Sequence, residues 1–197
     1  MRDQALAASG LLVNRLGGPA VKPYQPPGVW EEATFGKTRY VQDHGDALYR
    51  RSLYTFWRRI AAPTMFFDTA ARTVCTVNPS RTNTPLHALA TLNDTTYVEA
   101  ARVLAGRALD ADQSDAGRLD FVFRRVLARA PRPAEARVLF DGLEKHRAQF
   151  AAAPESAAKI LAVGEARSDP KLAPVEHAAW TALCLAVLNF DETLNKP

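Results

Sequence analysis

Residues 114–133 read SDAGRLDFVFRRVLARAPRP, and this stretch indicates the fold class most clearly. Ser114 is a typical side-chain cap for the start of a helix. Apolar side chains then recur at three- and four-residue spacing up to about Arg129, which is the pattern of a helix with one buried face. Pro131 and Pro133 mark a tight connection, and proline suits the first turn of a helix. The stretch therefore predicts two consecutive helices, the first of which turns inward Leu119, Val122, Phe123, Val126 and Leu127.

Similar patterns, caps and prolines predict helices along most of the chain. The most regular amphipathic pattern runs from Asp46 to Ile60. One run, TVCTV at 73–77, favours a strand, but a single strand has no partner for pairing. We predict one all-α, multi-helix globular domain over residues 1–197 with at most a minor strand. Besides the two helices above, we expect helices over about 2–16, 46–60, 84–92, 94–109, 154–163 and 174–188.

Residues 17–45 are rich in proline, glycine and aromatic residues and begin GGPAVKPYQPPGVW. Proline fixes φ and removes a hydrogen-bond donor, so this stretch is expected to be neither regular helix nor central strand. Large side chains such as Tyr24 and Trp30 argue against disorder, because disordered chains lack apolar anchors. We predict a long ordered loop laid over the helices, with Trp30 largely buried.

The composition is that of a globular protein, with 197 residues, 47% of them hydrophobic and 23% charged. No apolar run is long enough to span a membrane. The net charge of +4 is local, since residues 37–81 hold eight basic and three acidic residues. No recognised motif accompanies this charge, so we do not expect nucleic acid as a partner. Cys184 is expected in the core; whether it pairs with Cys75 stays open.

Familiar catalytic signatures are absent from the sequence. We find no glycine-rich phosphate loop, no nucleophile elbow around a serine, and no pair of metal-ligating histidines at helical spacing. The four histidines fall in different expected elements. We therefore expect no tightly bound metal and no haem on this chain.

The segment from Tyr24 to Asp94 is the best candidate for a binding site. Asp43 is next to His44 and could orient it, and arginines offer planar groups that suit carboxylate, sulfate or phosphate. Aromatic side chains such as Trp30 could stack on a sugar ring. The candidate ligand-binding residues are Tyr24, Trp30, Asp43, His44, Arg50, Arg51, Tyr54, Arg81 and Asn83.

A purely structural interpretation of the same residues stays open. Arg50 and Arg51 could pair with nearby acids such as Glu31 and Glu32, and the aromatic residues could belong to the core. Asp43 could cap a helix, as Asp46 could.

Several motifs resemble one known domain. They are GGPAVKPYQPPGVWEE at 17–32, LYRRSLYTFWRR at 48–59, RTNTPLHAL at 81–89 with LND at 92–94, and LNFDET at 188–193. In this order they are similar to the C-terminal domain of unknown function in planctomycete-type cytochrome c proteins. The resemblance implies a large exported parent protein of the periplasm or cell surface, with haem c on an upstream domain and no cofactor here. It supplies no established activity and no catalytic residues.

The chain also departs from that family. It holds no Cys-x-x-Cys-His motif and no signal peptide, and its first helix lacks a capping residue. We expect it to be the C-terminal part of a larger family domain whose N-terminal portion is missing.

Two classes of function follow. The first is a non-catalytic module that binds upstream domains of its parent protein or a ligand, for example an anionic glycan. The alternative is part of a hydrolase or oxidoreductase whose active site is completed by upstream domains, so whether the chain is catalytic stays open. Convergence of Asp43, His44, Arg50 and Arg81 favours the enzyme, a shallow aromatic–arginine groove favours binding, and dispersed, paired arginines favour a structural role.

Overall fold

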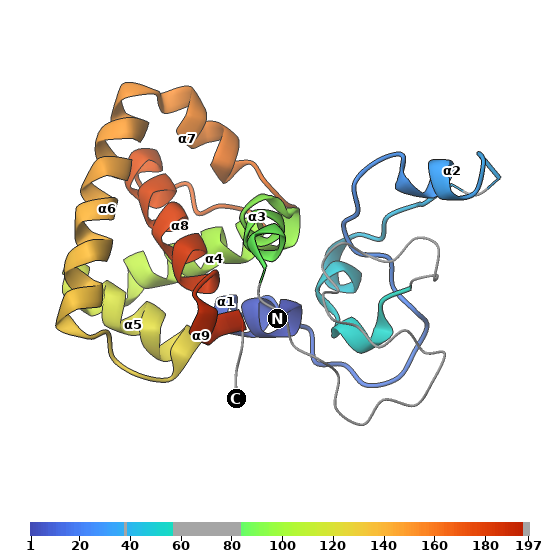
Figure 1. The fold of residues 1–197 in the computed structure, drawn as a ribbon, viewed down its shortest axis with the longest axis horizontal. Helices are drawn as coiled ribbons and strands as arrows, with labels where there is room; N and C mark the ends of the chain where they lie inside the picture. The colour runs from blue at the N-terminus through green and yellow to red at the C-terminus, as the bar shows by residue number, and fades with distance from the viewer. Residues whose placement is uncertain (38, 57–83, 195–197) are drawn as a thin grey trace.

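The computed structural model describes residues 1–37, 39–56 and 84–194. These residues form α-helices and short 3₁₀ helices, and none of them belongs to a sheet, which confirms the predicted all-α class. Two parts lie side by side in Figure 1: a helical body made by α1 and α3–α9, and an N-terminal segment, residues 11–56, that includes the short helix α2. The chain begins in the body, leaves it after α1 and returns at α3.

Two helices form the centre of the helical body. α4 (Thr95–Ala111) and α8 (Pro174–Leu188) make the most extensive helix–helix contact. α8 is apolar on nearly every side, which is typical of a fully buried helix. Their interface holds small side chains such as Ala101, Ala105 and Cys184, none of which is exposed. Small residues let the two backbones approach, so larger side chains from the outer helices fill the remaining core.

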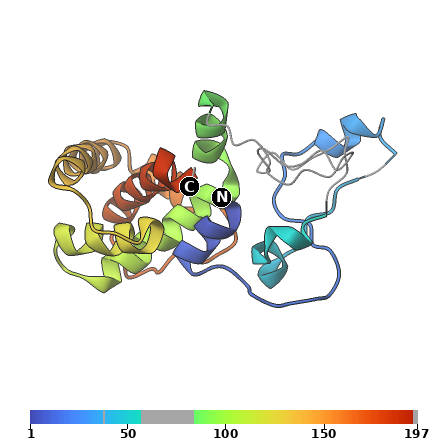
Figure 2. The same cartoon turned by 60° about the horizontal axis from the view of Figure 1, so that its bottom comes forward.

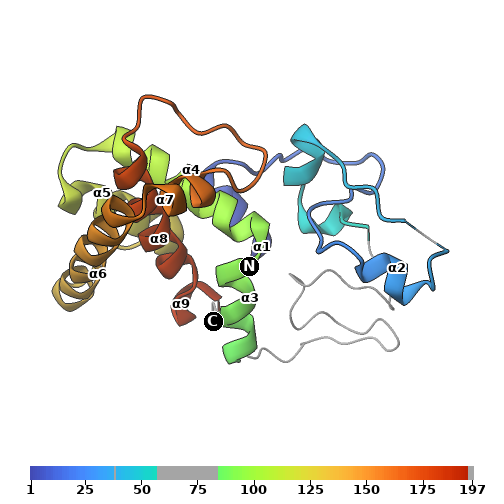
Figure 3. The same cartoon turned by 90° about the horizontal axis from the view of Figure 1, so that it is seen from above.

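The outer helices cover this pair. α5 (Asp115–Leu127) turns Leu119, Val122, Phe123 and Val126 into the core as predicted, while Leu127 is half-buried. α6 (Pro133–Ala152) and α7 (Pro154–Leu161) pack on α8 from the other side. α3 (Pro85–Asn93) packs on α4, on the side of the helical body that faces the N-terminal segment (Figures 2 and 3). Sequence patterns missed only a short last helix of the body, α9 (Asp191–Leu194).

The helix starts confirm the capping arguments. The side chains of Thr84, Asp94 and Ser114 each accept a hydrogen bond from a backbone N–H in the first turn of α3, α4 and α5. Four of the described helices begin with a proline, whose missing N–H has no partner to lose in the first turn. The predicted ends of these helices are correct to within two residues.

The predicted helix over residues 2–16 is too long. α1 (Arg2–Ser9) ends at Gly10, which adopts φ 84°, and the Gly10 N–H bonds to the Ala7 carbonyl. Gly10 is the left-handed residue that closes the helix. Beyond it the backbone is extended, and the Val13 N–H donates to the Tyr49 carbonyl over 3.0 Å.

The predicted helix over residues 46–60 is wrong where the structure describes it. Two short 3₁₀ helices occupy this stretch, η1 (Gly45–Tyr49) and η2 (Ser52–Tyr54), and Arg50 between them is extended at φ −66°, ψ 156°. Isolated parallel bridges join Val13 to Arg50 and Val21 to Thr55. Pairing with a distant segment thus overrides the local helical pattern. The possible strand at 73–77 and Cys75 lie outside the described residues.

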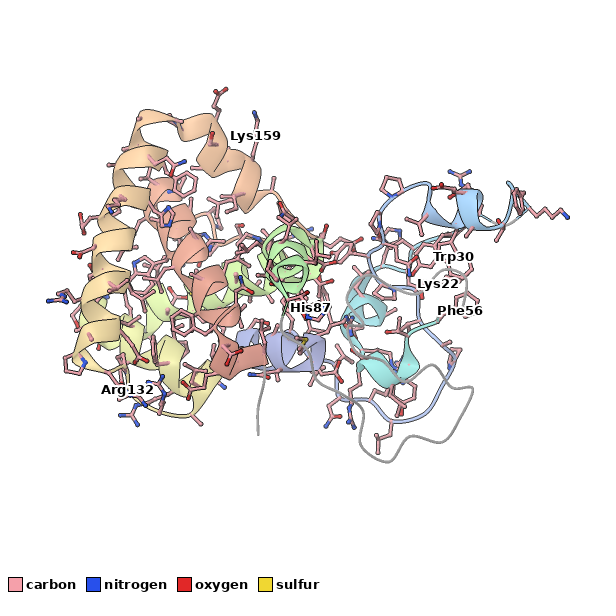
Figure 4. All side chains as sticks on the ribbon, in the orientation of Figure 1. Lys22, Trp30, Phe56, His87, Arg132 and Lys159 are labelled. Atoms are coloured by element: carbon pink, nitrogen blue, oxygen red, sulfur yellow. The ribbon has the colours of Figure 1, made fainter. Side chains whose placement is uncertain are left out.

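The proline-rich stretch folds around Trp30, which is buried as predicted. Its ring stacks between Tyr40 and Phe56, with both centroid distances 5.5 Å. Lys22 lies over the same Phe56 ring, and Figure 4 shows Lys22, Trp30 and Phe56 together in the N-terminal segment. The stretch was expected to hold no regular helix, and this prediction is wrong at one point, because it contains the short helix α2 (Val29–Ala33). It begins after Gly28, beyond the last proline of the stretch, where φ is no longer restricted.

Candidate functional site

Arg50 is enclosed by the N-terminal segment and is 0% exposed. Its guanidinium donates hydrogen bonds to the backbone carbonyls of Arg15, Gly17 and Pro19. It also stacks over the Tyr54 ring, 4.0 Å from the centroid, while the Tyr54 hydroxyl accepts from the Gly17 N–H. A cation with this many internal partners is unavailable to an external anion. Arg50 and Tyr54 therefore hold the loop together.

Arg51 points in another direction. Its Nε lies 3.9 Å from a carboxylate oxygen of Asp3, and its side chain is half-exposed. Neither Arg50 nor Arg51 pairs with Glu31 or Glu32 among the described contacts, so that pairing is wrong.

A second buried arginine, Arg2, lies next to this pair. Its guanidinium donates to the carbonyls of Leu48 and Arg50. Burial lowers the pKa of Arg2, and the nearby Asp3 carboxylate opposes that change. α1 is fixed to the N-terminal segment by these bonds.

Asp43 and His44 diverge, so Asp43 does not orient the imidazole. The Asp43 carboxylate accepts from the Lys22 N–H over 2.7 Å, and the Asp43 N–H donates to the Lys22 carbonyl over 2.9 Å. The His44 side chain is 75% exposed, and its Nδ1 lies 2.5 Å from Glu165 Oε1. That contact with His44 lowers the pKa of Glu165. Asp43 neither caps a helix nor forms a dyad.

Tyr24 and Trp30 also use their polar atoms for hydrogen bonds within the fold. The Tyr24 hydroxyl accepts from the Glu165 N–H over 2.9 Å, and the Trp30 indole donates to the Gln25 side chain. Trp30 is too buried to stack on a sugar. Arg81 and Asn83 lie outside the described residues.

A cluster that sequence reasoning missed centres on Glu99 of α4, which is 0% exposed. Glu99 Oε1 accepts from the Tyr49 hydroxyl over 2.9 Å and from the Ala166 N–H over 2.7 Å, and Arg102 lies 3.9 Å away. We call Tyr24, Tyr49, Glu99, Arg102 and Glu165 the Glu99 cluster. In the sequence, Glu99 and Arg102 look like an ordinary surface pair at (i, i+3) spacing, so no local signal marks them as buried.

Arg102 and Glu99 together fix the loop that follows α7. The Arg102 guanidinium bonds to the carbonyls of Val163 and Ala166 and to the Ser168 hydroxyl. Gly164 has φ 85°, and a Cβ there would lie 2.3 Å from the Glu99 carboxyl carbon. Only glycine fits this position without displacement of the carboxylate.

The electrostatics of the Glu99 cluster favour a structural role. Burial and the neighbouring Glu99 carboxylate raise the pKa of Tyr24 to about 12, and the same two causes raise the pKa of Tyr49 further. Both hydroxyls therefore remain protonated donors near neutral pH. The cluster joins Tyr49 of the N-terminal segment, α4, and the loop after α7.

Other chemistry is sparse in the described part of the chain. No group of three or more His, Cys, Asp or Glu side chains there is arranged to hold a metal ion. Cys184 is a free thiol inside the core, and burial raises its pKa, so it packs as a small apolar residue as predicted. None of the described helices has the length and apolar character needed to cross a membrane.

A protein-family model described as PSD1, protein of unknown function (DUF1553), matches residues 1–142. The chain belongs to this family. The PSD1 match covers three of the four motif groups quoted above and is consistent with a domain of planctomycete-type cytochrome c proteins; the LNFDET motif at 188–193 lies beyond it. No curated protein matches the chain, and neither does any solved structure.

Proposed function

We propose that this PSD1 domain is a non-catalytic interaction module that docks on an upstream domain of an exported, haem c-associated parent protein. One contrast carries the proposal. Arg50 of the N-terminal segment and Arg2 of α1 are used inside the fold, whereas large apolar side chains of the N-terminal segment are exposed to solvent.

The buried arginines argue against an anionic glycan as the main ligand. Arg50 has three carbonyl partners and Arg2 has two, so neither offers a free fork to a sulfate or carboxylate. Of the three candidate arginines only Arg51 has an exposed side chain within the described residues. Arg15, Lys37 and Arg39 of the same segment are exposed as well, but each surface ion pair is weak, so exposed basic side chains alone supply little affinity for an anionic polymer.

The exposed apolar side chains have an uneven distribution. Of eight such residues in the described chain, seven lie on the N-terminal segment and on α3, and one, Val138, lies on the outer helix α6. Exposed apolar side chains concentrated on one part of a protein are typical of an interaction surface. The seven are Leu16, Phe35, Val41, Leu53, Leu86, Leu89 and Leu92.

Phe35 is the most unusual member of this set. It is 92% exposed and adopts φ 52°, which is rare for an aromatic residue. It lies just after Thr34, the residue that ends α2, and its N–H bonds to the Glu32 carbonyl. A solvent-exposed aromatic side chain on a strained backbone supports a role in contacting a partner.

The test measures binding between this chain and the polypeptide encoded directly upstream of residue 1, by titration calorimetry. We expect the double variant Phe35→Ser, Val41→Ser to weaken binding at least about tenfold, since anchor side chains dominate interface energies. Val138→Ser is the matched control and should leave binding unchanged. Heparin, tested separately, should not bind. The proposal would be overturned if no polypeptide is encoded upstream, if that polypeptide does not bind, or if the two variants weaken binding equally. Tight binding of heparin would instead favour an anionic glycan as the ligand.

A further inference from the structure

A cavity of about 150 Å³ opens on the surface of the helical body, remote in sequence from the candidate residues above, and Asp110, Arg167 and Asp169 at its edge are exposed to solvent. α4 forms one wall, the loop that follows α7 forms another, and α8 closes it with His177. Val103 and Leu172 supply an apolar surface. The charged side chains around it are Arg102, Arg107, Asp110, Arg167 and Asp169.

The charges around this cavity are held apart. Arg102 is fully engaged with the loop backbone and Ser168. Among the described contacts, no ion pair joins Arg107 or Arg167 to Asp110 or Asp169, although all four line the same small space. Arg107 is held by the Ser9 carbonyl, and Asp169 is held by the Lys171 N–H. Two arginines and two aspartates thus line one cavity with no ion pair between them among the described contacts.

Two residues of α4, Asp110 and Gly106, lower the stability of the helix itself. Asp110 lies in the last turn, where the helix dipole disfavours a negative charge. Gly106 lies in the helix interior, where alanine is more stable. A Cβ at Gly106 would lie 3.5 Å from Leu172 and 3.6 Å from His177, an ordinary packing distance, so alanine would fit. Glycine leaves that space to the cavity.

His177 forms a neutral wall. It is buried, and its Nε2 lies 2.9 Å from the Arg102 carbonyl, so Nε2 carries the proton. Burial lowers the pKa of His177, which keeps the imidazole uncharged near neutral pH. The charge facing the cavity therefore comes from the arginines and aspartates.

We propose that this cavity binds a small aliphatic α-amino acid. Arg167 and Arg107 would face its carboxylate, Asp110 and Asp169 would face its ammonium group, and Val103 and Leu172 would contact its side chain. The volume suits such a ligand, since a cavity of about 150 Å³ in another protein holds a benzene molecule. This site does not depend on the docking proposed above.

The test titrates the purified chain with three related probes in a calorimeter. L-valine carries both charges, isovalerate lacks the ammonium group, and isobutylamine lacks the carboxylate. We expect L-valine to bind with a millimolar or lower Kd and the other two to bind at least about tenfold more weakly, because each loses one charged hydrogen-bonding group. No L-valine binding, or equal binding of isovalerate, would overturn the proposal.

Substitutions of the lining residues test whether L-valine binds in this cavity. Asp110→Asn and Arg167→Gln should each weaken L-valine binding about tenfold. Gly106→Ala should weaken it by taking up part of the cavity, while raising the melting temperature. Gly142→Ala is the matched control: it lies in α6 with open space around it, so it should raise the melting temperature and leave binding unchanged. Unaltered binding in Gly106→Ala would show that L-valine binds elsewhere.

Discussion

The Tyr49 hydroxyl donates a hydrogen bond over 2.9 Å to Glu99, which lies 50 positions further along the chain. This bond joins the N-terminal segment to α4 at a point that solvent does not reach. Because Glu99 also accepts from the Ala166 N–H, one carboxylate unites three parts of the chain that are far apart in sequence.

Tyr49→Phe should lower the free energy of unfolding by about 1–3 kcal/mol, since the buried Glu99 carboxylate loses one donor. Urea denaturation measures the change. Tyr97→Phe is the matched control, because the Tyr97 hydroxyl is buried with no hydrogen-bond partner in the described chain. That variant should be neutral or slightly stabilising. Equal losses in the two variants would contradict a special role for the Tyr49–Glu99 bond.

Gly164→Ala should destabilise the fold more than Gly28→Ala does. The two glycines have nearly the same φ, 85° and 84°. Both variants pay the conformational cost of about 1–2 kcal/mol. Only at Gly164 does the new methyl group also collide with Glu99, whereas nothing lies near Gly28. Thermal and urea melts of both variants measure the difference, and a smaller loss for Gly164→Ala would refute the geometry of the Glu99 cluster.

Arg50→Ala should be strongly destabilising, by about 3 kcal/mol, because three buried carbonyls lose their charged donor together. Arg51→Ala should change stability by no more than about 0.5 kcal/mol, since its side chain is half-exposed and its partner Asp3 is 3.9 Å away. Denaturant unfolding of the two neighbouring variants tests the assignment. If Arg51→Ala proves the more damaging, Arg50 is not the structural residue.

Acid should weaken the fold partly through Glu135. Hydrogen bonds from Arg129 lower the pKa of this carboxyl from 4.5 to about 2. A carboxyl with a lowered folded-state pKa stabilises the fold above its unfolded pKa, and the contribution is lost as the pH falls through the folded-state value. The unfolding free energy should therefore decrease between about pH 4.5 and pH 2. In Glu135→Gln this decrease should be smaller, and urea titrations at several pH values measure it. An unchanged pH dependence in the variant would contradict the prediction.

The comparison of α5 with η1 and η2 shows where sequence-based reasoning holds. Ser114 and the apolar side chains from Leu119 to Val126 act within one helix and against one core, so their spacing predicts α5 correctly. Tyr49, Leu53 and Phe56 show equally regular spacing, yet the backbone at Arg50 is extended. Local periodicity describes what a segment favours alone, and it contains nothing about distant partners.

The candidate site shows the same division. Its aromatic anchors were predictable, because a proline-rich stretch with Trp30 needs a buried aromatic to offset the entropy of an ordered loop. The role of Arg50 was not, because its partners are the carbonyls of Arg15, Gly17 and Pro19, and backbone carbonyls leave no mark in a sequence.

The all-α class, the starts of the capped helices and membership of the PSD1 family could be predicted from residue order alone, since these depend on short-range spacing and on motifs. Which charges are internal could be seen only in the folded protein. Glu99 and Arg102 look like a surface pair, but they are buried because Tyr49, Ala166 and the loop after α7 surround them. A charge enters the interior only where distant parts of the chain supply enough partners, and that condition is met by the fold as a whole.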